Sequence, residues 1–533
     1  MKKIISIAVL ALSAAQMFAQ TPYEGLKFSQ NDYLGSARTI AMGNAFTALG
    51  GDIGSLGINP AGSAVARYSQ TSITMGASIS TSDAMGTVLQ GDSYPYCFDQ
   101  NIKNAKGEFA MPGVGFVMDF KTGMKRGLKN VSFGFVCNAT GTYLDNTYDS
   151  GGHNGTSFAG RVAQVASGYP TSAYYGNSAY DNYDALAVLG WQSGMISNVN
   201  GTNDYVGATE QFTENPDGSR EFFTAGALNQ DWGRYVTGNK YDILINLGFN
   251  IGDIVFLGAN LGLQSLSYSS DEYLKETPLD RNDFEIDYGE DGKTYFSGLK
   301  YQYYYDAKGS GIFGKFGIII TPGPVRIGLA VQTPTLTSVS EIWGSAAETN
   351  FDNSKFNASA STPEFNQRYN LHSPARYNAG LAYTIGRIGV ISADYELTNF
   401  GSIKYKPAPR NEYSPFFDLN SDIKSSLGCA HAFRAGAEFK PISQLAIRAG
   451  YNLSTSGIKG IKTFDQAISG GLGYSSNGGF FCDAAVRCRL DKDEYIYPYD
   501  DYVTDSAGNL VPSPEILNFH NLWTAVVTVG FRF

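Results

Sequence analysis

Apolar and polar residues alternate along many segments of this chain, in runs of about ten positions. The final segment, 521–533, shows this most clearly, because every second residue from Trp523 to Phe533 is apolar or small and Arg532 lies on the other face. The stretch 444–453 repeats the pattern. A period of two is typical of a β-strand with one wet and one apolar face.

Fourteen such segments follow one another, and each is predicted to be a strand. They are 69–80, 109–120, 131–143, 240–251, 253–268, 301–320, 324–340, 369–385, 388–405, 429–440, 444–453, 465–475, 479–491 and 521–533. Their connections alternate between short turns rich in Gly, Pro and Asn and long loops, the longest being about 144–239. A soluble β-sandwich also alternates, but an even strand number with turns at one rim and loops at the other favours an outer-membrane barrel. The predicted fold is all-β: a transmembrane antiparallel β-barrel of about 14 strands over 69–533.

The N-terminus has the three parts of a secretory signal peptide. Lys2 and Lys3 precede an apolar run, and small residues follow as far as Ala19, so we expect residues 1–19 to be removed. No later run of ~20 apolar residues predicts a membrane-spanning helix. We therefore expect an exported protein of the bacterial outer membrane, with outer-membrane lipid as a partner.

Composition narrows the function classes. The chain has 533 residues, a net charge of −10 and only 17% charged residues, with 14% aromatic residues. This composition argues against disorder, and the acidic balance provides no field that would attract phosphates, so we expect no nucleic-acid partner.

Residues 20–68 are too long for a simple leader into the first strand. A barrel of fourteen strands is too wide for side chains alone to fill, so this stretch is predicted to be a hatch, or plug, inside the lumen. Its residues 41–49 are small and apolar enough for a short helix, and Asn59-Pro60-Ala61-Gly62 is turn chemistry. The alternative is that these residues only turn the chain into the first strand.

The run Ala41-Met42-Gly43-Asn44-Ala45-Phe46-Thr47-Ala48-Leu49, followed by Asn59-Pro60-Ala61, resembles the N-terminal hatch of the FadL family of outer-membrane transporters for long-chain fatty acids and aromatic hydrocarbons. The resemblance is strongest over 36–64. The stretch 373–380 is similar to a subgroup in Bacteroidetes-type bacteria.

The resemblance implies a monomeric barrel with a hatch inside, which passes a small hydrophobic ligand without an energy source. The hatch residues carried over are Gly43, Phe46, Asn59, Pro60, Ala61 and Gly62. The terminal Phe533 looks like the signal read by the outer-membrane assembly machinery. The long loop 144–239 and the acidic exterior depart from the best-known members and indicate a different ligand.

Charged residues on the polar faces of the predicted strands form a second candidate set. If the alternation holds, all of them point into the lumen: Asp394, Glu396, Arg434, Glu438, Arg448, Asp483, Arg487, Arg489 and Arg532. They can pair across neighbouring strands and hold the hatch. The simpler interpretation is an ion-paired, wet interior with no ligand role, which is the default for such barrels.

Cysteine, histidine and tyrosine add no chemistry at this point. Cys97, Cys137, Cys429, Cys482 and Cys488 include no Cys-x-x-Cys pair, and Cys482 and Cys488 are expected on the lipid face. His153, His372, His431 and His520 lack metal-ligand spacing and are expected to be solvated, so we expect no metal and no cofactor. Tyr301, Tyr303, Tyr304 and Tyr305 are interpreted as an interfacial aromatic belt.

No Ser and His can be assigned to adjacent strands with an orienting partner, so enzyme activity is not expected. The function predicted is passive uptake of hydrophobic compounds such as long-chain fatty acids or aromatic hydrocarbons. Two alternatives remain: a FadL-like barrel that docks a protein partner or serves secretion, and a general porin.

Overall fold

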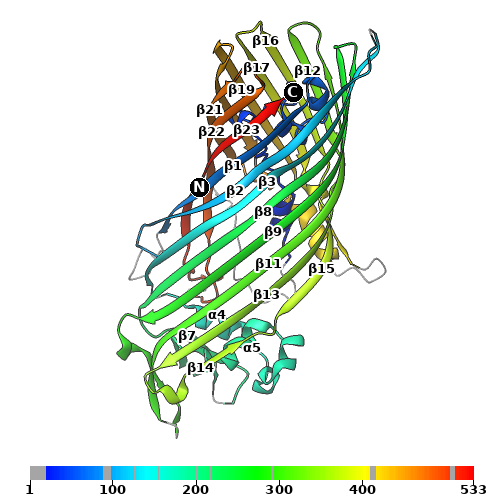
Figure 1. Cartoon of the computed structure of the whole chain (residues 1–533). Coiled ribbons are helices and arrows are strands. Elements are labelled where there is room, and N and C mark those ends of the chain that lie inside the picture. The colour runs from blue at the N-terminus through cyan, green and yellow to red at the C-terminus, as the bar shows by residue number, and fades with distance from the viewer. Residues whose placement is uncertain are drawn as a thin grey trace.

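The computed structural model describes residues 20–87, 98–124, 126–153, 155–199, 201–216, 218–289, 292–408, 416–504 and 510–533. The predicted signal peptide 1–19 and Cys97 lie outside these ranges. Over them the chain forms a closed antiparallel β-barrel of fourteen strands (Figure 1), which confirms the predicted fold class. The ladder between the first and last strands closes the barrel, from Gln70 opposite Arg532 to Gly86 opposite Ile516.

The wall strands correspond one to one with the fourteen predicted segments. They are β1 (Gln70–Gly86), β2 (Ile102–Lys121), β3 (Leu128–His153), β8 (Leu228–Ile251), β9 (Val255–Pro278), β11 (Lys293–Ile320), β12 (Val325–Gln332) with β13 (Leu336–Phe351), β15 (Phe365–His372) with β16 (Arg376–Ile385), β17 (Gly389–Asn399) with β18 (Lys404–Pro407), β19 (Cys429–Ile442), β20 (Leu445–Thr455), β21 (Phe464–Ser475), β22 (Phe480–Ile496) and β23 (Ile516–Arg532).

Three wall strands are each made of two pieces, because their ladders are interrupted. Pro334 separates β12 from β13, and Pro374 separates β15 from β16. Proline has no N–H to donate to a ladder, so the strand bends there and continues beside the same neighbour. A short 3₁₀ turn, η7 (Phe400–Ser402), divides β17 from β18 in the same way.

Side chains alternate between a buried inner face and an exposed outer face along the wall. On β9, Leu257, Leu261 and Leu263 are exposed, whereas Asn260 and Gln264 are buried. An apolar exterior around a polar interior is the arrangement of a barrel that faces lipid. Among the described residues, no helix is both long and apolar enough to cross a membrane.

The long connections gather at one end of the barrel, the lower end in Figure 1. We call residues 155–227 the cap. It contains α4 (Phe158–Ala166), η2 (Thr171–Tyr174), η3 (Asn177–Asp181), α5 (Ala185–Gln192), β4 (Ile196–Asn198), β5 (Tyr205–Gly207), β6 (Glu210–Glu214) and β7 (Arg220–Thr224). Other loops contribute η4 (Arg281–Phe284), β10 (Glu285–Asp287), η6 (Ser354–Phe356), β14 (Ala358–Ser361) and α6 (Phe417–Ser426).

The predicted loop 144–239 was too long at both ends. β3 and β8 continue as one ladder from Leu144 opposite Thr237 to His153 opposite Leu228. Both faces of this stretch carry polar residues, so the apolar alternation that marks a lipid-facing strand is lost although the hydrogen-bonded ladder continues.

The N-terminal segment (20–68) runs inside the barrel. Its elements are α1 (Pro22–Ser29), α2 (Ala37–Ala41), η1 (Ile53–Gly57) and α3 (Gly62–Val65). The helix predicted over 41–49 was wrong. α2 starts earlier, because the Ser36 hydroxyl accepts from the Thr39 N–H as an N-cap, and it ends early because Gly43 and Asn44 both adopt φ of +61°.

Candidate functional site: the barrel interior

Asn59, in the predicted turn, ties the N-terminal segment to two wall strands. Its amide nitrogen donates to the carbonyl oxygens of Thr47 at 2.6 Å, Ile318 at 3.3 Å and Leu329 at 3.4 Å. Its amide oxygen accepts from the Ala61 N–H at 3.1 Å. Asn59 is fully buried, and an unpaired amide in such a place costs about 1–3 kcal/mol. The turn therefore anchors the segment against β11 and β12.

The other hatch residues that the resemblance indicated hold the N-terminal segment close to the backbone around it. A Cβ added at Gly43 would lie 2.8 Å from the Tyr451 amide nitrogen, so the segment touches β20 without any intervening side chain. Phe46 is fully buried, with the Arg38 guanidinium 5.5 Å from its ring centre. Pro60, through its carbonyl oxygen, accepts from the Asn246 amide at 3.0 Å, and the Gly62 N–H donates to the Asn59 carbonyl at 3.0 Å.

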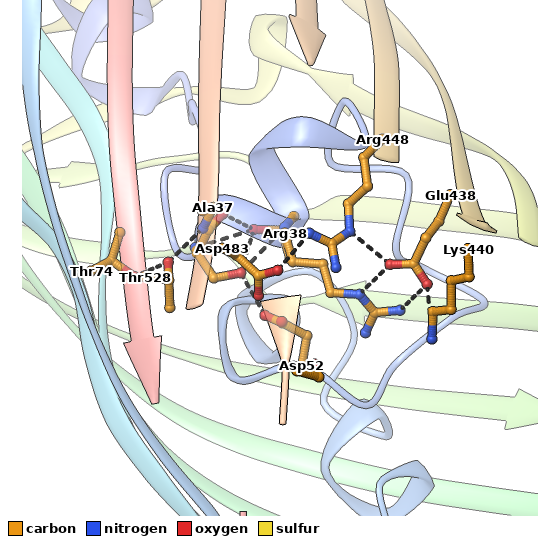
Figure 2. Close-up of polar contacts among 12 residues, drawn as sticks. Ala37, Arg38, Asp52, Thr74, Glu438, Lys440, Arg448, Asp483 and Thr528 are labelled. Atoms are coloured by element: carbon orange, nitrogen blue, oxygen red, sulfur yellow. Dashed lines mark hydrogen bonds and ion pairs between the residues drawn. The ribbon is translucent and has the colours of Figure 1, made fainter. Parts of the chain in front are cut away.

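A chain of buried ion pairs joins the segment to three wall strands (Figure 2). Arg38 Nε lies 2.9 Å from Glu438 Oε2 on β19, and Arg448 Nε on β20 lies 2.7 Å from the same oxygen. Arg448 Nη1 then reaches Asp483 Oδ1 on β22 at 2.6 Å. Lys440 approaches Glu438 Oε1 at 3.6 Å from the exposed side. One cation of the N-terminal segment thus completes a network whose other members belong to the wall.

A second group of wall charges contacts the segment nearer to the cap. Asp394 Oδ2 accepts from the Thr47 N–H at 2.7 Å. Glu396 accepts from Arg376 Nη1 at 3.2 Å and from Arg434 Nη2 at 2.8 Å. The Tyr33 hydroxyl donates to the same carboxylate at 3.4 Å.

The last three predicted charges also face inward. Arg487 and Arg489 both pair with Asp32 of the N-terminal segment, the latter at 3.2 Å. Arg532 lies near the short-turn rim, where its guanidinium is 5.5 Å from the Tyr68 ring centre and 4.5 Å from that of Phe481. All nine predicted lumenal charges are therefore placed on the inner face, and most of them contact the segment.

Two interior lysines were not singled out from the sequence. Lys315 Nζ donates to the Gly57 carbonyl at 2.7 Å, and Lys240 Nζ donates to the Phe28 carbonyl at 3.1 Å. Both are fully buried. The same alternation would have placed them on the inner face, since each shares the parity of the buried residues on its strand.

Between the N-terminal segment and the cap lies a chamber of about 1170 Å³. One side of its wall is mainly aromatic, and most of the charged wall residues lie on the opposite side. The aromatic side, on β9 to β15, contains Tyr268, Tyr301, Tyr303, Tyr305, Trp343 and Phe365. The charged side, on β16 to β23, contains Arg376, Glu396, Arg434, Arg487, Arg489 and His520.

This chamber corrects the interpretation of the tyrosines. Tyr301, Tyr303 and Tyr305 line the interior, and the first and last are almost fully buried, so they are not an interfacial belt. Their alternate positions on β11 share the inner face, whereas Tyr304 has the opposite parity. The number of aromatic residues suggested an interfacial belt. Their odd or even position along β11 determines whether each side chain faces the interior or the exterior.

The ladder between β2 and β3 ends beside the chamber. β2 pairs with β3 only from Lys121 opposite Asn130 to Gly113 opposite Asn138, although β3 continues to His153. Beyond that point the N-terminal segment takes the place of β2: the N–H of Asp32 donates to the Thr140 carbonyl at 2.8 Å, and the N–H of Leu34 donates to the Ala139 carbonyl at 2.9 Å. The segment therefore occupies a free edge of the wall.

Cys482 and Cys488 are half-buried on the outer parity of β22. The expectation that all histidines are solvated was wrong for His153. It is buried, and its Nε2 accepts from the Thr156 N–H at 2.8 Å. Among the described residues, no group of His, Cys, Asp and Glu could hold a metal ion.

Comparison with known proteins bears on the fold. No protein-family model and no curated protein matches the chain. Among solved structures, a FadL homologue of Pseudomonas aeruginosa matches with a TM-score of 0.51 and 10% identity, over 94% of this chain and 99% of the homologue. The toluene transporter TodX of P. putida matches with a TM-score of 0.49 and 14% identity, over 94% and 99%. The chain therefore has the fold of the FadL homologue.

Proposed function

We propose that the protein is an outer-membrane channel for the passive uptake of hydrophobic or amphipathic compounds. The observation that carries this proposal is the chamber, which lies between the N-terminal segment and the cap and is partly walled by aromatic rings. Burying apolar surface there stabilises a ligand by roughly 25 cal/mol per Å², which offsets the resistance of the outer leaflet to hydrophobes. The names of the structural neighbours, a FadL homologue and a toluene transporter, agree with such a role.

In this proposal the N-terminal segment is a hatch. Its buried contacts with the wall support that role, and the parted edge of β2 and β3 supports a lateral way out toward lipid. Tyr143 and Leu144 of β3 line the chamber just beyond that edge. Removal of residues 1–19, a monomeric state and recognition of Phe533 by the assembly machinery are further parts of the proposal. Long-chain fatty acids and aromatic hydrocarbons are the substrate classes to test first.

The experiment compares two kinds of solute in proteoliposomes. A fluorescent long-chain fatty acid should enter protein-containing vesicles faster than empty ones, while sugars should cause no swelling beyond that of empty vesicles. Native mass spectrometry of the detergent-purified protein should show co-extracted apolar molecules. Sugar-driven swelling without apolar molecules in the protein would instead identify a general porin.

A further inference from the structure

The chamber contains a buried carboxylate that neither the hatch contacts nor an ion pair uses among the described residues. Glu272, on β9, lines the chamber with 8% of its surface exposed. Its Oε2 atom has no hydrogen-bond partner among the described residues, and its Oε1 accepts only a long bond of 3.5 Å from the Ser270 hydroxyl. A buried carboxylate with so few donors is costly, so its environment favours the arrival of a positive group.

The neighbours of Glu272 leave a local excess of negative charge. Arg234, on β8, is directly opposite Glu272 in the ladder. That guanidinium is already bound by Asp145 at 2.7 Å and by Glu494 at 2.6 Å. Asp145 and Glu494 therefore take up the guanidinium that faces Glu272, and among the described residues Glu272 itself forms no ion pair.

The same excess extends over the whole chamber. Among the described residues that line it, nine are Asp or Glu and six are Lys or Arg. The five arginines all have carboxylate partners: Arg234, Arg376, Arg434, Arg487 and Arg489. The sixth cation, Lys27, has Tyr268 as its hydrogen-bond partner. The chamber is thus better supplied with negative than with positive charge.

Aromatic rings surround Glu272 on the inner face. Tyr303, on β11, is its direct partner across the ladder, and Tyr301 and Tyr305 are the diagonal neighbours. Tyr268 lies on the same face of β9, and its ring already accepts a cation, because the Lys27 ammonium lies 4.6 Å from the ring centre. Rings of this kind attract ammonium groups through their negative faces, most strongly where water is excluded.

We infer that Glu272 and the tyrosines around it form a binding site for the ammonium group of an organic cation with an apolar or aromatic body. The inference rests on the proposed function only in taking the chamber as the ligand site, and it names a substrate class for it. A metal ion is a poorer fit, since the described residues offer no metal-binding group.

Arg434 offers the opposite chemistry to a ligand. Its Nε and Nη1 have no hydrogen-bond partner in the described part of the chain. However, its Nη2 is bound to Glu396, and its guanidinium lies 5.2 Å from the ring centre of Tyr33. An anionic ligand at this guanidinium would displace or share those partners, whereas a cation at Glu272 would meet an unpaired charge.

The test uses three probes of similar shape on the full chain in lipid nanodiscs. Benzyltrimethylammonium, benzyl alcohol and benzoate carry a positive, a neutral and a negative group, and calorimetric titration measures their affinities. The ammonium probe should bind at least tenfold more tightly than benzoate. Glu272→Gln should weaken the ammonium probe about tenfold and leave benzyl alcohol within about twofold, because it removes the charge and keeps the shape.

Control variants separate the site from general charge. Asp283→Asn removes an exposed carboxylate of η4 that does not line the chamber, and should change the ammonium affinity by less than twofold. Tyr303→Phe should retain binding, and Tyr303→Leu should weaken it severalfold. Lys27→Gln should strengthen it, because the ammonium that occupies Tyr268 is removed. A thermal unfolding curve for each variant checks that it is folded.

Two outcomes would overturn the inference: benzoate binding as tightly as the ammonium probe, or an unchanged ammonium affinity in Glu272→Gln. If the fatty-acid uptake assay succeeds while either outcome occurs, only this inference fails. If none of the three probes binds and the fatty-acid uptake also fails, the proposed function fails with it.

Discussion

The barrel interior has two halves that use the same inward-facing positions in opposite ways. Near the short-turn rim, the N-terminal segment fills the lumen, and charges such as Arg38, Glu438 and Arg448 are paired. Near the cap, the lumen is open over about 1170 Å³, and Glu272 is left without an ion-pair partner. Paired buried charges fix one arrangement of the chain, whereas an unpaired charge beside open space is suited to a ligand. The contrast separates the part that the N-terminal segment fills from the part that we propose as the ligand site.

Loss of the Arg38 ion pair should loosen the filled half most. Arg38→Ala leaves Glu438, whose side chain is 3% exposed, with one fewer cation. Breaking a buried pair from one side costs about 3–5 kcal/mol. Hydrogen exchange should show faster opening of residues 36–65, and planar bilayers should show a raised ion conductance. The matched control is Arg67→Ala, which removes an exposed pair with Asp253 and should cost less than about 1 kcal/mol. Equal effects of the two variants would contradict the contrast.

Loss of the Asn59 amide should cause the next largest decrease in the local stability of the N-terminal segment. Asn59→Ala removes the donor to the Thr47, Ile318 and Leu329 carbonyls, with an expected cost of about 2–3 kcal/mol in local stability. Hydrogen exchange of residues 45–62 measures it. Asn282→Ala, at an exposed site in η4, is the control and should change little. Unchanged exchange in Asn59→Ala would show that packing alone holds this turn.

The junction between the two halves can be tested at one glycine of β2. A Cβ at Gly113 would lie 2.0 Å from the Gly35 carbonyl oxygen, so Gly113→Ala forces the N-terminal segment away from β2 at the point where it meets the edge of β3. Overpacking of this kind costs about 1–3 kcal/mol. A spin label on the segment should become more mobile. Gly107→Ala on the same strand meets nothing nearer than 3.9 Å and should leave the label unchanged.

A pH dependence is expected at α1. Burial, together with the nearby Glu341 carboxylate, raises the pKa of Glu24 to about 7 from its ordinary value of 4.5. The folded segment therefore binds the proton more tightly than the released one, and its anchoring weakens as pH rises from 4.5 through 7. Protease protection of residues 20–30 should be greater at pH 5 than at pH 8. Glu24→Gln should remove this dependence, and a variant that keeps it would exclude Glu24 as the cause.

The alternation of apolar and polar residues was sufficient to predict the wall strands and which of their charged residues face the interior. The alternation around Arg434, Glu438 and Arg448 follows from one strand period, so their inward direction could be predicted residue by residue. The role of Glu272 could not be predicted in this way. Its lack of a partner depends on the ion pairs that Arg234 forms with carboxylates from two other strands. The course of residues 41–49 also escaped prediction, since the positive φ of Gly43 and Asn44 reflects close approach to the wall as much as local propensity.

The barrel wall is much taller on one side than on the other. β20 has 11 residues, and at about 3.3 Å per residue and a tilt near 45° it rises roughly 25 Å, about the height of the apolar band of an outer membrane. β11 has 28 residues and rises more than twice as far. The mouth of the barrel is therefore slanted, and its high side carries the cap. In the outer membrane that we propose for this protein, the cap would stand well beyond the lipid headgroups, and a molecule arriving from the medium would meet this projecting wall before it reached the bilayer surface.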